Sequence, residues 1–160
     1  MISDDLKNIL EQQAPNSNTL YTRSLLKEAL QNYVLNFVYN DPDYKTLIFT
    51  GGTCLRKIYG LPRLSEDLDF DCTGEFKIEK FASKVKTYFD EEILYKEMTT
   101  KISGNGKTVF LKFPINFGKS PIIFVRCDFA PEAIGHFKTE VSSISVGQFT
   151  VFALSFDLPT

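Results

Sequence analysis

The hydrophobic positions near the start of the chain repeat with the period of an α-helix. Between residues 20 and 40, apolar pairs recur three to four residues apart: Leu25/Leu26, Ala29/Leu30, Tyr33/Val34 and Phe37/Val38. This spacing predicts a helix over residues 20–40 with one buried face. A shorter helix is predicted over residues 3–12. The Asp41-Pro42-Asp43 segment ends the longer helix because the residue before a proline disfavours helical geometry.

The next segments alternate between short apolar runs and helical patterns. Residues 45–50 predict a buried strand, and residues 53–59 predict a helix closed by Gly60. Residues 67–71 alternate acidic and apolar side chains. On a strand, this alternation places three carboxylates on one face and two apolar side chains on the other. A second long amphipathic helix is predicted over residues 77–96.

The second half of the chain predicts mainly strands. Residues 98–103 and 107–113 flank a Gly-Asn-Gly segment at 104–106 that suits a tight hairpin turn. Further strands are predicted over residues 121–130 and 146–154. The order of the elements predicts an α+β fold, in which helices pack mainly on one face of a mixed β-sheet.

Composition and charge narrow the classes of function. The 160 residues are 43% hydrophobic and 24% charged, which indicates one globular domain with its own core. The formal net charge of −2 provides no chain-wide positive field. A polynucleotide or triphosphate would therefore need a local basic patch or metal ions.

The cysteines and the N-terminus bear on the cellular compartment. Cys54, Cys72 and Cys127 are odd in number and far apart, which fits neither a disulfide framework nor a zinc site. The first residues lack the pattern of a signal peptide, and no apolar run approaches the length that spans a bilayer. We therefore expect a cytoplasmic protein without a membrane partner.

A glycine pair follows the strand predicted over residues 45–50. Gly51 and Gly52 let the backbone approach a ligand closely, and free N–H groups at the positive end of the following helix can bind a phosphate. The hydroxyl of Thr53 could add a donor. For the pair by itself, a tight turn without a ligand is the commoner explanation.

Alternating carboxylates are the stronger chemical signal. Asp67, Asp69 and Asp71 would repel one another on one strand face, so a fold tolerates them in open solvent or around a cation. Carboxylates and substrate phosphates suit Mg²⁺, and two such ions can clamp a phosphoryl transfer. Asp128 is the candidate third ligand, since an unpaired acid in its apolar strand is costly. The alternatives are a solvated edge strand for the triplet and an ion pair with Arg126 for Asp128.

Other polar side chains are weaker candidates. Ser65 could contact a phosphate, or carry one that competes for the ions, although a hydroxyl that stabilises a turn is the simpler explanation. Arg63, Lys57 and Arg56 could neutralise a triphosphate or an RNA backbone. For Arg56 and Lys57, a solvated helix face explains the charges at least as well. His136 has no neighbouring nucleophile and is interpreted as structural.

The segments GGTCLRKIYG and RLSEDLDFD, residues 51–60 and 63–71, closely resemble the AbiEii/AbiGii nucleotidyltransferase toxin family of the polymerase-β-like superfamily. That superfamily combines a glycine pair that opens a helix, an acid–apolar–acid motif, and a third acid on a later strand. The Arg-x-Ser-x-Asp-Leu-Asp-Phe pattern is more specific and points to this family. The resemblance is strong over residues 47–71, and the order of elements extends it to about residues 20–155.

The resemblance implies a polymerase-β-like nucleotidyltransferase domain over residues 1–160, with N-terminal helices in 1–45 and a catalytic core in 46–160. It implies transfer of a nucleoside monophosphate from a nucleoside triphosphate to an acceptor hydroxyl, for which tRNA is a candidate. It also implies the toxin of a toxin–antitoxin or abortive-infection system, with a cognate antitoxin as partner.

The resemblance assigns roles to residues that match the family pattern. Asp67, Asp69 and Asp128 would hold two Mg²⁺ ions, with Mn²⁺ as an alternative, and the turn over residues 51–53 would hold the triphosphate. Family members usually continue into a helical C-terminal region that also holds the nucleotide. This chain reaches residue 160 about where that region begins, so we expect it to be absent here.

Two other classes of function stay open. The chain could be a catalytically incomplete module of the same fold that binds a nucleotide or a partner protein. It could also be a structural domain that binds Ca²⁺ tightly without a triphosphate.

Overall fold

The computed structural model describes residues 2–12, 19–60, 67–115, 122–131, 139–146 and 149–156. Its strands are β1 (Ile48–Thr50), β2 (Asp67–Cys72), β3 (Thr99–Ser103), β4 (Thr108–Pro114), β5 (Ile122–Pro131), β6 (Thr139–Val146) and β7 (Phe149–Phe156). Its helices are α1 (Ile2–Gln12), α2 (Thr19–Asn40), α3 (Gly51–Tyr59), α4 (Ile78–Thr87) and the π-helical segment η1 (Tyr88–Glu92). Among these helices, none is long and apolar enough to cross a membrane.

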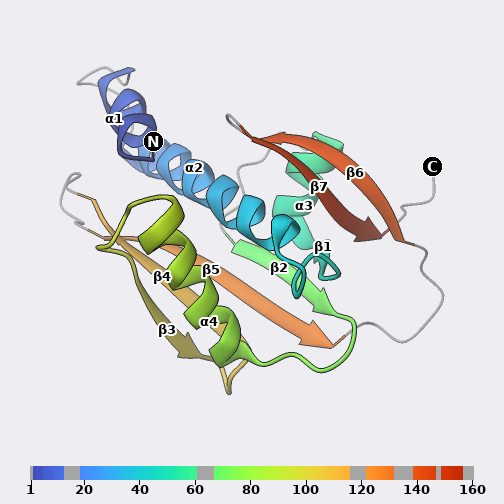
Figure 1. The fold of residues 1–160 in the computed structure, drawn as a ribbon. Coiled ribbons are helices and arrows are strands. Elements are labelled where there is room, and N and C mark those ends of the chain that lie inside the picture. Colours follow the sequence, from blue (N-terminus) through green and yellow to red (C-terminus); the bar gives the residue numbers. More distant parts are fainter. Residues whose placement is uncertain are drawn as a thin grey trace.

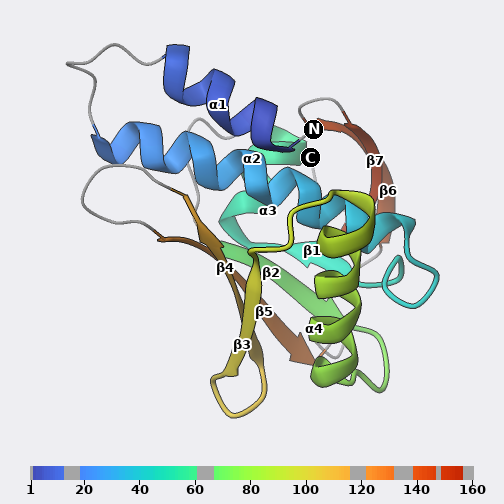
Figure 2. The same cartoon turned by 60° about the vertical axis from the view of Figure 1, so that its left-hand side comes forward.

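The strands form one mixed sheet in the order β3-β4-β5-β2-β1-β7-β6 (Figure 1). The strand β2 lies at its centre, parallel to β5 and antiparallel to β1, and β1 is in turn parallel to β7. The predicted mixed sheet is confirmed. Figure 2 shows α2 and α4 on the same side of this sheet, with α1 packed on the outside of α2.

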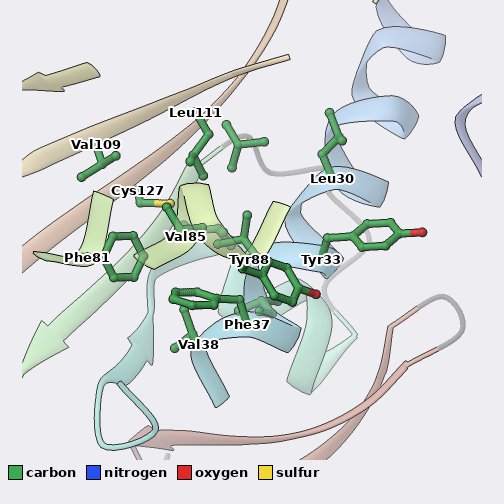
Figure 3. Packing of buried hydrophobic residues seen from close by; sticks show 14 of the residues in the cluster. Leu30, Tyr33, Phe37, Val38, Phe81, Val85, Tyr88, Val109, Leu111 and Cys127 are labelled. Carbon is green, nitrogen blue, oxygen red and sulfur yellow. The ribbon is translucent and has the colours of Figure 1, made fainter. Parts of the chain in front are cut away.

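Alternation along the central strands creates the core face of the sheet. Leu68 and Phe70 of β2 are buried, and the ring of Phe70 stacks on that of Phe129 in β5 with the centroids 5.7 Å apart. Figure 3 shows how side chains of α2 and α4 meet those of β4 and β5 in this core: Phe37, Val38, Phe81, Val85, Val109, Leu111 and Cys127. Burying such side chains is the main force that holds the helices on the sheet.

The helix α3 starts directly at Gly51, two residues earlier than predicted. Gly51 has a φ of 78°, a conformation that glycine adopts without strain. The helix ends as predicted at Gly60, whose φ is 73° and whose N–H donates to the carbonyl of Arg56 at 3.0 Å. Such a left-handed glycine is a common helix terminator. The β1–α3 connection therefore has no loop, and the helix begins directly at the end of β1.

Two predicted elements have different bounds. The helix predicted over 77–96 ends at residue 92, where α4 has passed into the π-helical segment η1 and Leu94 follows with a φ of 61°. The strand predicted from residue 45 begins only at residue 48. The preceding residues form a turn instead, in which the N–H groups of Tyr44 and Lys45 donate to the carbonyl of Asp41.

The strand predicted over residues 146–154 corresponds to β7, which runs over Phe149–Phe156, but the strand before it was not predicted. The structure has two antiparallel strands there, β6 and β7, which pair over their whole length. The strand β6 carries several serines and is the edge strand of the sheet. The apolar side chain of Val141 in β6 is 66% exposed. The sequence of β6 therefore does not show the apolar alternation that is typical of a strand with one face in the core.

Candidate functional site

Strand pairing brings the separated carboxylates together on one face of the sheet. The register of β2 and β5 sets Asp69 beside Asp128 and Asp67 beside Arg126. The apolar residues between them are buried in the core, so these polar side chains share the opposite face. We call this surface, which carries Asp67, Asp69 and Asp128, the carboxylate face. Figure 1 shows β2 and β5 side by side at the centre of the sheet.

The crowded carboxylates make negative charge costly at Asp69. Burial raises the pKa of Asp69, and the carboxylates of Asp128 and Asp67 raise it further, while Arg126 opposes them. Like charges held this close favour the uptake of a cation or a proton. A cation bound beside Asp69 would therefore reduce the repulsion among these carboxylates.

Asp128 has partners of its own. Arg126 Nε lies 2.9 Å from Asp128 Oδ2 and 3.1 Å from Oδ1. The hydroxyl of Thr108, in the neighbouring strand β4, donates to Oδ1 at 2.6 Å. The ion pair with Arg126, considered as an alternative for Asp128, is thus present in the structure. In the part of the chain that the structure describes, no three Asp, Glu, His or Cys side chains are grouped closely enough to hold one metal ion.

Gly51 lies against the carboxylate of Asp69. A β-carbon built on Gly51 would overlap Asp69 Oδ2, so a side chain at this position would displace the carboxylate. This contact places the first residue of α3 beside the acidic strand, where the positive end of a helix dipole stabilises negative charge. The backbone start of α3 and the carboxylates therefore lie at one place, as the predicted site requires.

The polar side chains of α3 have other surroundings than predicted. Thr53 is buried, and its hydroxyl donates to the carbonyl of Asp67. Lys57 Nζ lies 2.7 Å from Asn32 Oδ1 and 3.9 Å from Glu28, and its side chain is 5% exposed. A solvated helix face, one of the two explanations considered for Lys57, is thus wrong, because the side chain is buried against α2. The phosphate-binding role considered for Lys57 stays a prediction.

The environment of Lys57 is unusual for a lysine. Burial lowers its pKa to about 8, with an opposing contribution from Glu28 and a further lowering by Arg56. Arg56 also pairs with Glu28, at 3.2 Å. These side chains attach α3 to α2 and so fix the position of the helix whose first residue contacts Asp69.

Some predicted residues cannot be placed, and others were missed. Arg63, Ser65 and His136 lie outside the described residues, so their predicted roles stay predictions. Thr108 was missed, because its position opposite Asp128 depends on the register of β4 with β5. Arg126 was considered only as a partner of Asp128, although it also lies beside Asp67.

The residues fit a hard divalent cation in their donor chemistry. All three candidate ligands are carboxylates, the oxygen donors that Mg²⁺ and Mn²⁺ accept. The ion pair with Arg126 also shows that Asp128 accepts a cationic partner. The fit has two conditions: Asp128 exchanges its guanidinium partner for the ion, and the carboxylates, which among the described residues are not grouped closely enough to hold one ion, move together around it.

Comparisons with known proteins identify the fold and the family of this chain. The structure is similar to that of MenT4, a nucleotidyltransferase toxin from Mycobacterium tuberculosis, with a TM-score of 0.55 and 19% sequence identity. The match covers 84% of this chain and 48% of MenT4, so this chain spans about half the length of that protein. At this identity the likeness concerns the fold. No curated protein matches the sequence significantly.

A family model gives the decisive match. The model described as "Nucleotidyl transferase AbiEii toxin, Type IV TA system" matches residues 36–156. The matched region contains all strands of the described sheet together with Gly51 and the three carboxylates of the site. The chain therefore belongs to the AbiEii nucleotidyl transferase toxin family.

Proposed function

We propose that this protein is a metal-dependent nucleotidyltransferase that transfers a nucleoside monophosphate from a nucleoside triphosphate to an acceptor hydroxyl. The observation that carries the proposal is the register of β2 and β5, which sets Asp69 beside Asp128 on the face that also carries Asp67. The contact between Gly51 and Asp69 adds the start of a helix to the same place. A triphosphate needs both features, since amides bind phosphate and carboxylates hold the counter-ions.

Each residue would have a separate task in this reaction. Asp67 and Asp69 would hold Mg²⁺ or Mn²⁺, and Asp128 would contribute the third carboxylate beside the attacking hydroxyl. When bound, these ions supply charge neutralisation at the transferred phosphoryl group. The backbone at Gly51 and Gly52 would bind the phosphates, because the absence of side chains lets them approach. Most of the rate would come from positioning and electrostatic stabilisation.

The transfer step is a substitution at phosphorus. The acceptor oxygen forms a bond to the α-phosphorus while the bond from that phosphorus to the bridging oxygen breaks, and pyrophosphate leaves. The proton of the acceptor hydroxyl passes to a base, for which Asp128 is the candidate because it is hydrogen-bonded in place by Thr108.

In our proposal, the biological role of the protein is inferred from its family. We infer that the protein is the toxin of a toxin–antitoxin or abortive-infection system, with a cognate antitoxin as partner and tRNA as acceptor. The family description supports a type IV toxin, and the name of MenT4 also describes a toxin. Because the net charge is −2, an RNA acceptor would need a local basic surface.

A catalytically incomplete module is the second candidate. The observation that favours it is the ion pair of Asp128 with Arg126, which engages the third carboxylate. Such a module would bind nucleotide or antitoxin and release no pyrophosphate.

One experiment separates the two candidates. The protein is incubated with each labelled nucleoside triphosphate, Mg²⁺ and total tRNA, and both pyrophosphate and labelled tRNA are measured. We expect Asp67→Asn and Asp69→Asn to lose transfer by a factor on the order of 10² or more. We also expect them to unfold at the same or a higher urea concentration, because each change relieves repulsion between carboxylates.

Asp90→Asn is the matched control. Asp90 lies in η1, is paired with Lys86 at 2.6 Å, and has no place in the proposed site. It should keep full transfer. Full activity of the Asp67→Asn protein would show that the proposed mechanism is wrong, and nucleotide binding without pyrophosphate release would favour the incomplete module.

A further inference from the structure

Arg126 supplies a positive charge on the carboxylate face. Its Nε contacts both oxygens of Asp128, and its position in β5 is registered with Asp67 in β2. Its guanidinium also lies 5.8 Å from the ring centroid of Phe110 in β4. The protein thus holds an internal cation against a carboxylate that, in the proposed function, holds a metal ion.

We propose that Arg126 exchanges partners when the substrate binds: in the free protein it neutralises Asp128, and in the complex it binds the triphosphate and releases Asp128 to the divalent cation. This inference rests on the proposed function and deepens it. It makes the assembly of the complete site depend on the nucleotide, because the third carboxylate becomes available only when a phosphate takes over the guanidinium.

The surroundings of Arg126 permit this movement. Its side chain is 47% exposed, so it can leave Asp128 without opening the core. A guanidinium presents several N–H donors in one plane, which match the oxygens of a phosphate as well as those of a carboxylate. The new partner therefore replaces the hydrogen bonds that Asp128 provided.

The surroundings of Asp128 keep it in position during the exchange. Thr108 is 5% exposed, and its hydroxyl donates to Asp128 Oδ1 at 2.6 Å. This bond does not involve Arg126, so Asp128 stays oriented after the guanidinium has left. Asp128 therefore keeps its hydrogen bond to Thr108 while its second partner changes from Arg126 to the divalent cation.

The exchange predicts two effects of opposite sign for Arg126→Gln. Binding of Mn²⁺ alone, measured by the loss of the free-ion EPR signal, should become about tenfold tighter because a competing charge-assisted hydrogen bond is gone. Binding of inorganic tripolyphosphate in EDTA, measured by calorimetry, should become about tenfold weaker because the same kind of bond to phosphate is lost. A purely structural role would weaken both.

Two further variants control for charge. Arg126→Lys keeps the positive charge and should lie between the native protein and Arg126→Gln in both measurements. Lys112 lies on the same face, where its ammonium is 5.9 Å from the ring centroid of Phe124. Lys112→Gln removes one positive charge from this face and should change both affinities by less than about threefold.

Asp69→Asn makes the possible failures distinguishable. If Asp69→Asn binds Mn²⁺ as well as the native protein does, the ion is held elsewhere, and both the proposed function and this inference are wrong. If Asp69→Asn loses Mn²⁺ but Arg126→Gln does not bind it more tightly, the exchange is overturned while the proposed site stands. Tighter Mn²⁺ binding together with unchanged tripolyphosphate binding would also overturn it, because Arg126 would then have no second partner.

Discussion

The α-carbon of Gly51 faces the carboxylate of Asp69, with no room between them for a side chain. One residue opens α3 and the other is the central acid of β2. This contact joins the two motifs that stand out in the sequence, and it explains in steric terms why the first position of the pair is glycine.

Gly51→Ala should therefore damage the site as well as the fold. We expect a loss of stability above the roughly 1–2 kcal/mol that a positive φ costs a residue with a side chain, and at least about tenfold weaker Mn²⁺ binding because Asp69 must move. Gly60→Ala is the control, since Gly60 has a similar φ of 73° and no atom within 4 Å of a built β-carbon. It should lose stability and keep Mn²⁺ affinity. Equal Mn²⁺ affinities in the two variants would mean that the contact has no role in the site.

Thr53 provides a second connection between α3 and β2. Because its hydroxyl donates to the carbonyl of Asp67 and the residue is 1% exposed, Thr53→Val should lower the free energy of unfolding by about 1–3 kcal/mol, through a buried acceptor left without this donor. Thr53→Ser keeps the hydroxyl and should recover most of that loss. Urea unfolding of the three proteins measures the difference. If serine and valine are equally destabilising, the methyl group rather than the hydroxyl makes the contribution.

Lys57 should give stability a distinctive dependence on pH. Its pKa is lowered from 10.5 to about 8 in the folded protein, first of all by burial. The unfolded chain therefore holds the proton more tightly, and the cost of burying the charge is fully present below pH 8 and relieved as the pH rises toward 10.5. Relative to Lys57→Met, the native protein should gain stability between pH 8 and 10, as measured by urea unfolding at each pH. Parallel pH profiles of the two proteins would contradict this prediction.

The local pattern was sufficient for the elements that build the site. Alternation with a period of two places Asp67 and Asp69 on one face of any strand, and a glycine pair before a helix predicts an exposed helix start. A local sequence pattern does not indicate which strands pair with each other in the sheet. That Asp128 lies beside Asp69, and that Thr108 reaches Asp128, depends on the pairing of β2, β5 and β4, which the packing of the whole sheet decides.

The errors also have physical causes. A solvated face was one of the two explanations considered for Lys57 because charge predicts exposure, but a polar side chain can equally be buried against polar partners such as Asn32. The strand β6 was missed because an edge strand with an exposed outer face, as at Val141, needs no apolar alternation. The end of the helix at residue 92 follows a π-helical turn, which has no recognisable sequence pattern.

The position of β7 has a consequence for biosynthesis. This strand pairs with β1, through Phe49 and Ser155, although the two lie far apart in the sequence. On the ribosome, the nascent chain therefore exposes the outer edge of β1 until residues 149–156 have emerged. Translation of an mRNA truncated before that point would release a polypeptide in which β1, next to the acidic strand β2, has an unpaired edge. Such a polypeptide is prone to aggregate.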